Sequence, residues 1–388
     1  MAHQEFDVNG RPARWTAFLF GVIGVQTFII QPGIVQGIVA TLGYTERQAG
    51  WVAATEMGGL ALAAGILALW TDRIDWHRTL RSGALLAAAA DVASAFAHDV
   101  VTFSAARFIA GFGLGALVSL SWAAVGLTRD PDRQFGWYVG WALIYGAVGI
   151  VVLPAAFSSI GMSGVMVAMG AFALFAVPFV RFMPRSAASR TAPNPDAVEI
   201  SSAMKALALT GIFAFNTALG AAWAYLFLIG VAAGLAEQSI ANALAVSQIA
   251  AVVGSIVVVV MGQRFGRIGP VCVGLLVSAA SLAPLLGTVS LAQYTLGVCT
   301  FNFLWNIVLP YAFAAFSSYD RTGRMVVAAV ALQMLGFGIG PGAAAMLMQP
   351  NDFDAVVILA MGLIGASCVM LLAAALHHRA CLRSSFSR

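Results

Sequence analysis

Residues 100–127 read VVTFSAARFIAGFGLGALVSLSWAAVGL, an apolar stretch in which Arg107 is the one charged side chain. A transmembrane helix needs about 20 mainly apolar residues, so this stretch is long enough to cross a bilayer. Its Ala, Leu and Gly residues run continuously, whereas a strand of a membrane β-barrel alternates polar and apolar side chains. The stretch therefore predicts a membrane-spanning α-helix.

Eleven further apolar stretches of similar length lie along the chain. The twelve predicted spans cover about 15–40, 48–70, 79–97, 100–127, 135–158, 161–182, 204–232, 238–262, 268–287, 290–316, 325–349 and 355–377. Short polar segments separate them. Inside the membrane, every backbone N–H and C=O group must form a hydrogen bond within the protein. Continuous spans of this kind are therefore helical. The predicted fold class is an all-α membrane protein with 12 transmembrane helices.

The overall composition agrees with a membrane protein. Of 388 residues, 61% are hydrophobic and 9% are charged, and the mean hydropathy is +0.90. A soluble chain carries about 25% charged residues, so a soluble enzyme is excluded. The net charge of +4 is spread thinly, which excludes a nucleic-acid binder. The expected partners are the lipid bilayer and a small-molecule substrate, and the expected oligomeric state is a monomer.

The sequence predicts no metal ion and no cofactor. The four cysteines form no CxxC pair, and the five histidines lie at the ends of predicted spans or in the tails. The nucleotide-binding pattern GxxxxGK[ST] is absent, so ATP is not the expected energy source.

The basic residues predict the orientation in the membrane. A cytoplasmic N-terminus places eighteen of the 20 Lys and Arg residues on the cytoplasmic side. Arg47 alone lies on the opposite side, and Arg107 lies within a span. Because cytoplasmic loops carry the excess of Lys and Arg, we expect both termini in the cytoplasm and the chain in the cytoplasmic (inner) membrane.

One long polar segment divides the chain. Residues 184–202 read PRSAASRTAPNPDAVEISS, a composition typical of a flexible linker. The predicted organisation is an N-terminal six-helix bundle (1–183), a cytoplasmic linker (184–203) and a C-terminal six-helix bundle with a short tail (204–388). Arg73 and Arg264 stand in similar loops of the two halves. Two such repeats suit a transporter with its substrate site between them.

Short motifs lie at matching places in the two halves. The loop after the second span keeps Asp72 and Arg73 of the pattern G-x-x-x-D-R-x-G-R-R, with Arg78 nearby. Ala68 and Asp75 stand where that pattern has glycine.

The matching loop of the second half keeps R-x-G-R as Arg264, Gly266 and Arg267, and the fourth span keeps R-x-x-x-G-x-G from Arg107. With these motifs and the 6+6 arrangement, the chain resembles the major facilitator superfamily along nearly its whole length.

This resemblance implies an alternating-access secondary transporter built from two pseudo-symmetric bundles. It also implies a cytoplasmic gate that includes Asp72, Arg73, Arg78, Arg264, Gly266 and Arg267. The Gly-Pro motif that marks many drug/proton antiporters in the fifth span is absent, since Gly149 and Pro154 stand apart. That departure favours uptake over export.

Three ionisable residues lie deep in the predicted spans: Glu56, Asp91 and Arg107. All three fall roughly 9–12 Å from the outer membrane face at 1.5 Å per residue. A charge there costs about 2.5–3.5 kcal/mol, so each needs a partner or a role. We expect proton coupling, with Glu56 as the titrating carboxylate, Arg107 as its partner and Asp91 in support. Alternatively, Asp91 and Arg107 form a structural pair between their spans.

In the family that the chain resembles, spans 1, 4, 7 and 10 line the substrate cavity. Polar and aromatic residues there and in span 5 are the predicted substrate contacts: Arg107, Gln31, Trp141, Tyr145, Asn216, Trp223, Asn302, Trp305 and Asn306. Arg107 would hold a carboxylate, the amides would bond oxygens and the aromatic rings would stack. The alternative for the amides is bonding between helices, worth about 0.6 kcal/mol each.

The sequence therefore predicts a proton-coupled symporter of a small organic acid, with aromatic acids among the candidate substrates. One alternative is a proton-coupled exporter of hydrophobic or cationic compounds, in which Arg107 is structural. An alternative of another class is a membrane sensor that transports nothing.

Overall fold

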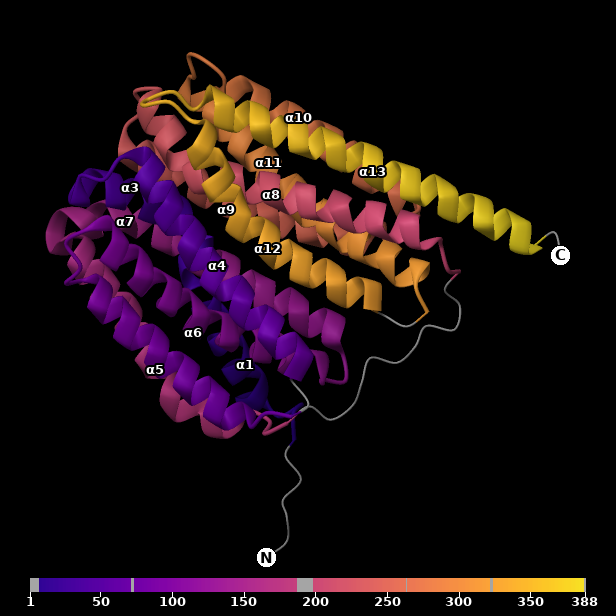
Figure 1. Ribbon diagram of the computed structural model, residues 1–388, viewed down its shortest axis with the longest axis horizontal. Helices are drawn as coiled ribbons and strands as arrows, with labels where there is room; N and C mark the ends of the chain where they lie inside the picture. Colours follow the sequence, from indigo (N-terminus) through magenta and orange to yellow (C-terminus); the bar gives the residue numbers. More distant parts are fainter. Residues whose placement is uncertain (1–6, 71–72, 187–197, 263, 322–323, 387–388) are drawn as a thin grey trace, which may run out of the picture. The chain divides into compact units, whose positions relative to one another are not determined.

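The computed structural model describes residues 7–70, 73–186, 198–262, 264–321 and 324–386. The chain divides into two compact units, one of Met1–Tyr44 and Thr55–Arg190, the other of Thr45–Ala54 and Thr191–Arg388. The regular elements in the described ranges are all helical apart from one isolated bridge between Gln349 and Asp352 (Figure 1). The predicted all-α class is confirmed.

The first predicted span is broken into three short helices, α1 (Arg11–Gly24), α2 (Gln26–Ile29) and α3 (Gln31–Leu42). The breaks fall at Val25 (φ −107°, ψ 8°) and Ile30 (φ −103°, ψ 12°). Pro32 accounts for the second break, because its ring clashes with the carbonyl group four residues earlier in a continuous helix. The span therefore departs from a continuous helix at two points within one membrane crossing.

The fifth and sixth predicted spans are two arms of one hairpin, α7 (Pro131–Ala176), which the short 3-10 helix η1 (Val177–Phe182) follows. The chain reverses at Gly161, where φ is 66° and ψ is −177°, a conformation open to glycine. In a straight helix, Tyr145 and Phe172 would lie roughly 40 Å apart. Their rings instead stack with centroids 5.9 Å apart, which shows that the arms run side by side.

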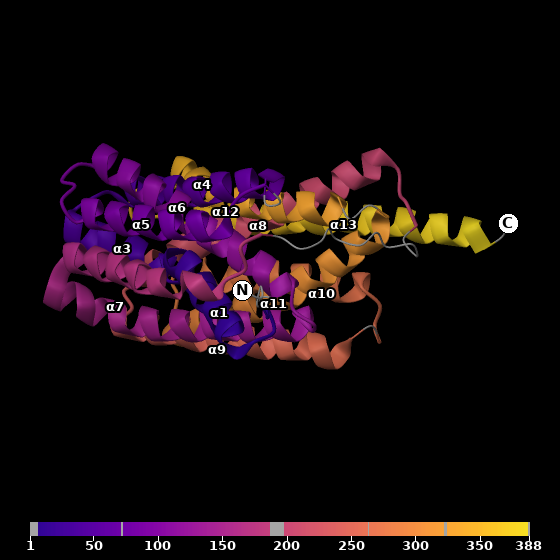
Figure 2. The same cartoon turned by 90° about the horizontal axis from the view of Figure 1, so that it is seen from below.

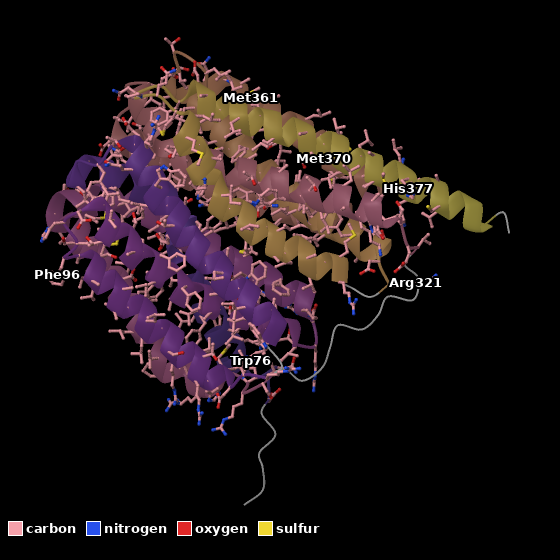
Figure 3. All side chains as sticks on the ribbon, viewed as in Figure 1. Trp76, Phe96, Arg321, Met361, Met370 and His377 are labelled. Carbon is pink, nitrogen blue, oxygen red and sulfur yellow. The ribbon has the colours of Figure 1, made fainter. Side chains whose placement is uncertain are left out.

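The first unit also contains α5 (Trp76–Ser94), α6 (Val100–Gly126) and, from Thr55 onward, α4 (Glu46–Trp70). Trp76 begins α5 and is fully buried, whereas Phe96, just beyond its other end, is 71% exposed (Figure 3). Glycines bring α4 and α6 together: a methyl group on Gly59 would overlap the carbonyl oxygen of Phe108. Such small residues let helix backbones touch inside a membrane.

The second unit contains α8 (Ser202–Ala232), α9 (Glu237–Met261), α10 (Ile268–Leu282), the 3-10 turn η2 (Ala283–Leu285), α11 (Leu291–Tyr319), α12 (Arg324–Leu347) and α13 (Asp354–Phe386). Helix α8 is buried along most of its length and packs against α12 and α13. A methyl group on Gly340 of α12 would overlap the carbonyl oxygen of Thr217 on α8. Helix α13 also packs on α10 and runs on as one long helix (Figure 2).

The two units repeat one packing detail. Gly254 on α9 lies against the carbonyl oxygen of Phe303 on α11, as Gly59 on α4 lies against that of Phe108 on α6. The two glycines are as many residues apart along the chain as the two phenylalanines are. This repeat supports the pseudo-symmetry inferred from the loops.

Nine helical segments of the described ranges are long and apolar enough to cross a membrane. The long α7 segment supplies two of the predicted spans. The two predicted spans outside this set are the broken α1–α3 and α5, whose first turn carries His77 and Arg78. The set is consistent with 12 crossings.

Candidate functional site

Three charged side chains of the first unit form a buried ion cluster: Glu56 on α4, Asp91 on α5 and Arg107 on α6. Their side chains are 2%, 0% and 1% exposed, respectively. The close approach of α4 and α6 explains the contact, because a methyl group on Gly111 would overlap the backbone carbonyl of Glu56 itself. The structure thus brings together the three residues that the sequence singled out for proton coupling.

Arg107 places all five of its N–H donors on protein acceptors. Nε donates to Glu56 Oε2 at 3.1 Å, and Nη2 donates to Glu56 Oε1 and, at 3.3 Å, to Thr27 Oγ1. Nη1 donates to Asp91 Oδ1 and faces the Met166 sulfur at 3.4 Å. Glu56 therefore forms the two-pronged pair that arginine and carboxylates favour, whereas Asp91 forms a single bond.

Asp91 keeps one oxygen free. Its Oδ2 has no hydrogen-bond partner among the residues that the structure describes, although the side chain is fully buried. A buried polar atom without a partner is rare and needs an explanation. A proton on Oδ2 would remove the negative charge of Asp91 without breaking a hydrogen bond.

The charge balance of the ion cluster also favours the binding of one proton. Two carboxylates and one guanidinium carry a net charge of −1 when all are ionised. Burial makes such a residual charge costly, and one added proton cancels it. The ion cluster is therefore chemically suited to gain and lose a single proton as one coupled unit.

The second unit has an amide where the first has this arginine. Asn302 on α11 stands at the offset from Arg107 that also relates Phe303 to Phe108. Its Nδ2 donates to Ser247 Oγ on α9 at 2.7 Å. This bond joins two helices without any ionisable group.

The other two predicted amide contacts of the second unit, Asn216 and Asn306, donate to carbonyl oxygens of their own helices. Asn216 is fully buried, and its Nδ2 donates to Ile212 O at 2.8 Å. Asn306 donates to Asn302 O at 3.0 Å.

Trp223 and Trp305 meet edge to face with centroids 6.2 Å apart. The structure brings these two predicted rings together. Their role in substrate binding stays a prediction.

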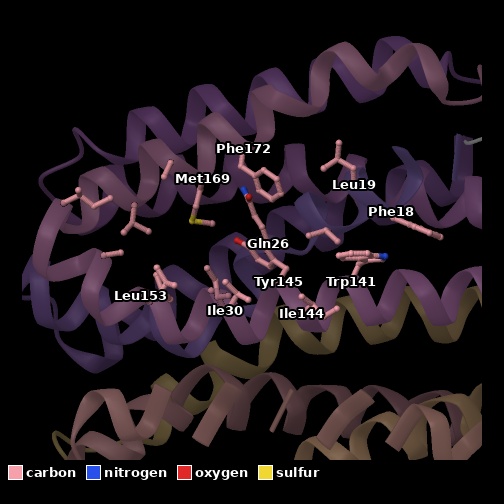
Figure 4. Close-up of a pocket in the computed structure, with 18 of the residues that line it drawn as sticks. Phe18, Leu19, Gln26, Ile30, Trp141, Ile144, Tyr145, Leu153, Met169 and Phe172 are labelled. Atoms are coloured by element: carbon pink, nitrogen blue, oxygen red, sulfur yellow. The ribbon is translucent and has the colours of Figure 1, made fainter. Parts of the chain in front are cut away.

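A pocket of about 800 Å³ lies within the first unit, lined by α1, α2, Ile30 and both arms of α7 (Figure 4). Trp141 and Tyr145 line this α1–α7 pocket, as does Gln26. Gln31 does not line the pocket. Its side chain is 1% exposed, and neither its amide oxygen nor its amide nitrogen has a hydrogen-bond partner in the described part of the chain. Two of the predicted aromatic contacts therefore share one wall.

The loop before α5 contains part of the predicted gate. Asp72 lies outside the described residues. Arg73 donates its backbone N–H to Trp70 O at 2.9 Å. Asp75 caps α5 by accepting from the Arg78 N–H at 3.0 Å, and that bond holds the pKa of Asp75 below its usual range. Helix capping thus explains why an aspartate replaces the glycine of the family pattern.

In the second unit, the matching loop is tied to α11. Arg267 Nη1 donates to Ala314 O at 2.8 Å, and Tyr311 OH donates to Gly262 O at 2.7 Å. Gly266 has a φ of 68°, in the left-handed region. Arg264 lies in the same turn and donates its N–H to Met261 O at 3.2 Å.

Three residues of these sites were not among the predicted site residues: Thr27 and Met166, which contact Arg107, and Gln26, which lines the α1–α7 pocket. Thr27 shares a helical face with Gln31, which was a weak signal in the sequence. The sequence gave no signal for Met166, because its contact with Arg107 depends on the α7 hairpin.

Comparisons with known proteins agree with the repeat architecture. The sequence profile described as the Major Facilitator Superfamily matches residues 16–341. The fold is similar to the crystal structure of the nucleoside transporter NupG, with a TM-score of 0.72 and 12% identity over 94% of this chain and 99% of that chain. It is also similar to a bacterial homologue of the human lysosomal transporter Spinster, solved inward-facing and unoccupied. There the TM-score is 0.68 and the identity 15%, over 96% of this chain and 98% of that chain.

Proposed function

Because the chain belongs to the major facilitator superfamily, we propose that it is a proton-coupled secondary transporter that moves a small organic solute by alternating access. The family and the apolar helices make it a multi-pass membrane protein with a transporter fold. We further propose that it resides in the cytoplasmic membrane as a monomer, with both termini in the cytoplasm.

The ion cluster carries the proposal of proton coupling. Glu56 and Asp91 share one guanidinium, and Asp91 Oδ2 has no partner in the described residues. We assign the exchangeable proton to Asp91, in place of the Glu56 expected from the sequence. A proton on Glu56 would displace one of two N–H donors, whereas a proton on Asp91 Oδ2 displaces none.

Symport of an organic acid follows from competition for Arg107. Every donor of Arg107 is occupied by the protein, so a substrate carboxylate must displace one of these protein acceptors. Protonation of Asp91 on Oδ2 removes its negative charge and weakens its bond to Nη1 without breaking it, so a substrate carboxylate can then displace Oδ1. One proton and one anion then load together, which is the stoichiometry of electroneutral symport.

Export of hydrophobic compounds is the second candidate. The α1–α7 pocket, whose lining is apolar and aromatic apart from the amide of Gln26, favours it. In that case Arg107 would have a structural role, which agrees with the bonding of all five of its N–H donors to the protein.

Transport assays separate the two candidates. The protein would be expressed in a transporter-deficient host, and uptake of labelled organic acids would be measured beside resistance to a panel of dyes and drugs. Symport predicts acid uptake that rises with an inward proton gradient and fails in Arg107→Ala. Raised resistance without acid uptake would contradict symport and support export. No flux of any solute under a proton gradient would contradict both.

A further inference from the structure

The α1–α7 pocket has the size and walls of a site for a small organic molecule. Its volume is about 800 Å³ and all of its lining residues belong to the first unit. Such sites typically measure about 300–1,000 Å³ and combine apolar and aromatic walls with a few polar groups. The pocket meets each of these criteria.

Two aromatic pairs form its walls. Trp15 and Trp141 meet edge to face with centroids 5.4 Å apart, and Tyr145 stacks on Phe172 at 5.9 Å with an interplanar angle of 15°. These faces offer flat apolar surfaces to a ring system. Among the described residues that line the pocket, none is an Asp, Glu, Lys, Arg or His, so a neutral occupant is favoured over a charged one.

Gln26 supplies the polar contact. Its side chain lies beside Tyr145 and Phe172 in the pocket (Figure 4). It is 0% exposed, and neither Oε1 nor Nε2 has a hydrogen-bond partner in the described part of the chain. Buried amides are almost always bonded, so both free ends point to a missing partner. Gln26 begins α2 in the broken first span, and transporters often bind ligands at such breaks.

We propose that the α1–α7 pocket binds a neutral aromatic solute that carries one hydroxyl, amide or protonated carboxyl group. That group both donates to Oε1 and accepts from Nε2 of Gln26. A lipid acyl chain would fill the apolar walls but would leave the amide unpaired. The binding itself stands apart from transport; only the identification of this solute with the transported one rests on the proposed function.

Equilibrium binding to the purified full chain in detergent tests the site without any transport step. The probes are labelled 2-naphthol, which has one donor–acceptor group, and naphthalene, which has none. Micelles without protein provide the background. We expect saturable binding of both and a preference of at least about tenfold for 2-naphthol, because its hydroxyl makes two hydrogen bonds with the amide and one alone can contribute about that much.

Three variants locate the site. Gln26→Leu should abolish the preference for 2-naphthol and leave naphthalene binding intact. Gln36→Leu, a buried amide of the same span that does not line the pocket, is the matched control and should keep the preference. Ala168→Trp, which places a large side chain in the pocket and leaves Gln26 unchanged, should abolish binding of both probes and keeps the test valid if Gln26→Leu fails to fold.

Some outcomes would overturn the proposal. They are a preference that survives in Gln26→Leu, binding that survives in Ala168→Trp, or no saturable binding at all. Hexadecane competing as well as 2-naphthol, with no effect of Gln26→Leu, would identify a groove for lipid chains instead. Because no proton gradient is used, a failure of proton coupling would leave this result unaffected.

Discussion

Asp91 offers Arg107 one of its two carboxylate oxygens: Oδ1 accepts from Nη1, and the buried Oδ2 has no partner in the described residues. Glu56 uses both of its oxygens on the same guanidinium. The two acids therefore differ in how many bonds a proton would disrupt. This difference underlies the assignment of the exchangeable proton to Asp91.

Neutral variants of the two acids should differ in transport. Asp91→Asn fixes the neutral state, so proton-driven accumulation should be lost while exchange of substrate down its own gradient persists. Glu56→Gln should weaken both activities, because it replaces one of the two acceptor oxygens with an NH₂ group, which donates and would face a guanidinium N–H. Proteoliposome uptake with and without a pH gradient measures this. Normal accumulation in Asp91→Asn would contradict the assignment.

Removing Arg107 should destabilise the first unit. Arg107→Leu leaves two buried carboxylates without their cation, a change that typically costs about 3–5 kcal/mol. Adding Glu56→Gln and Asp91→Asn to the same chain should restore much of the loss, since no buried charge then remains. Thermal unfolding in detergent compares the variants. Equal melting temperatures for Arg107→Leu and the unaltered protein would show that the cluster contributes nothing to stability.

Two adjacent glycines provide a matched test of helix packing. A methyl group on Gly59 would overlap the carbonyl oxygen of Phe108, whereas one on Gly58 would meet nothing within 4 Å. Gly59→Ala should therefore force α4 and α6 apart and lower the melting temperature. Gly58→Ala should be neutral or stabilising by up to about 1 kcal/mol, the difference in helix propensity. Similar losses in both variants would argue against the close approach.

The cap of α6 should make stability depend on acid pH. Asp99 Oδ1 accepts from the N–H groups of Val101 and Thr102 at 3.0 Å each, and Oδ2 accepts from the Thr102 hydroxyl at 2.6 Å. The side-chain bond from Thr102, followed by its backbone bond, holds the pKa of Asp99 below its usual value. A carboxylate with a lowered pKa stabilises the fold above its unfolded-state pKa, and this contribution is lost as pH falls through the folded-state pKa, below about 4.

Asp99→Asn is the control for this cap, because asparagine caps helices about as well and does not titrate. Its melting temperature should fall less than that of the unaltered protein between neutral and acid pH, and Asp99→Ala should be the least stable at pH 7. An identical acid loss in Asp99→Asn would place the titration elsewhere.

Much of the fold was predictable because membrane spans are continuous apolar stretches separated by charges. The cluster residues Glu56, Asp91 and Arg107 were found for the same reason, since a charge inside such a stretch is conspicuous. Their geometry was not predictable: which acid binds with two oxygens depends on the contact between Gly111 and the backbone of Glu56, a tertiary feature.

The pocket was visible only in part. Trp141 and Tyr145 stood out as a stripe at helical spacing, but their partners come from other segments. Phe172 stacks on Tyr145 because the chain reverses at Gly161. Gln26 lines the pocket from α2, the short helix between the two breaks of the first span. The sequence located neither the reversal nor the first break with enough precision to pair these side chains.

Infrared spectroscopy of the reconstituted protein tests the proton assignment most directly, because it needs no substrate. On acidification, one buried carboxylic acid should give a C=O stretching band. We expect this band to shift when the aspartate side chains are labelled with ¹³C, to persist in Glu56→Gln and to vanish in Asp91→Asn. A band that shifts with ¹³C-glutamate instead, or that survives in Asp91→Asn, would contradict the account.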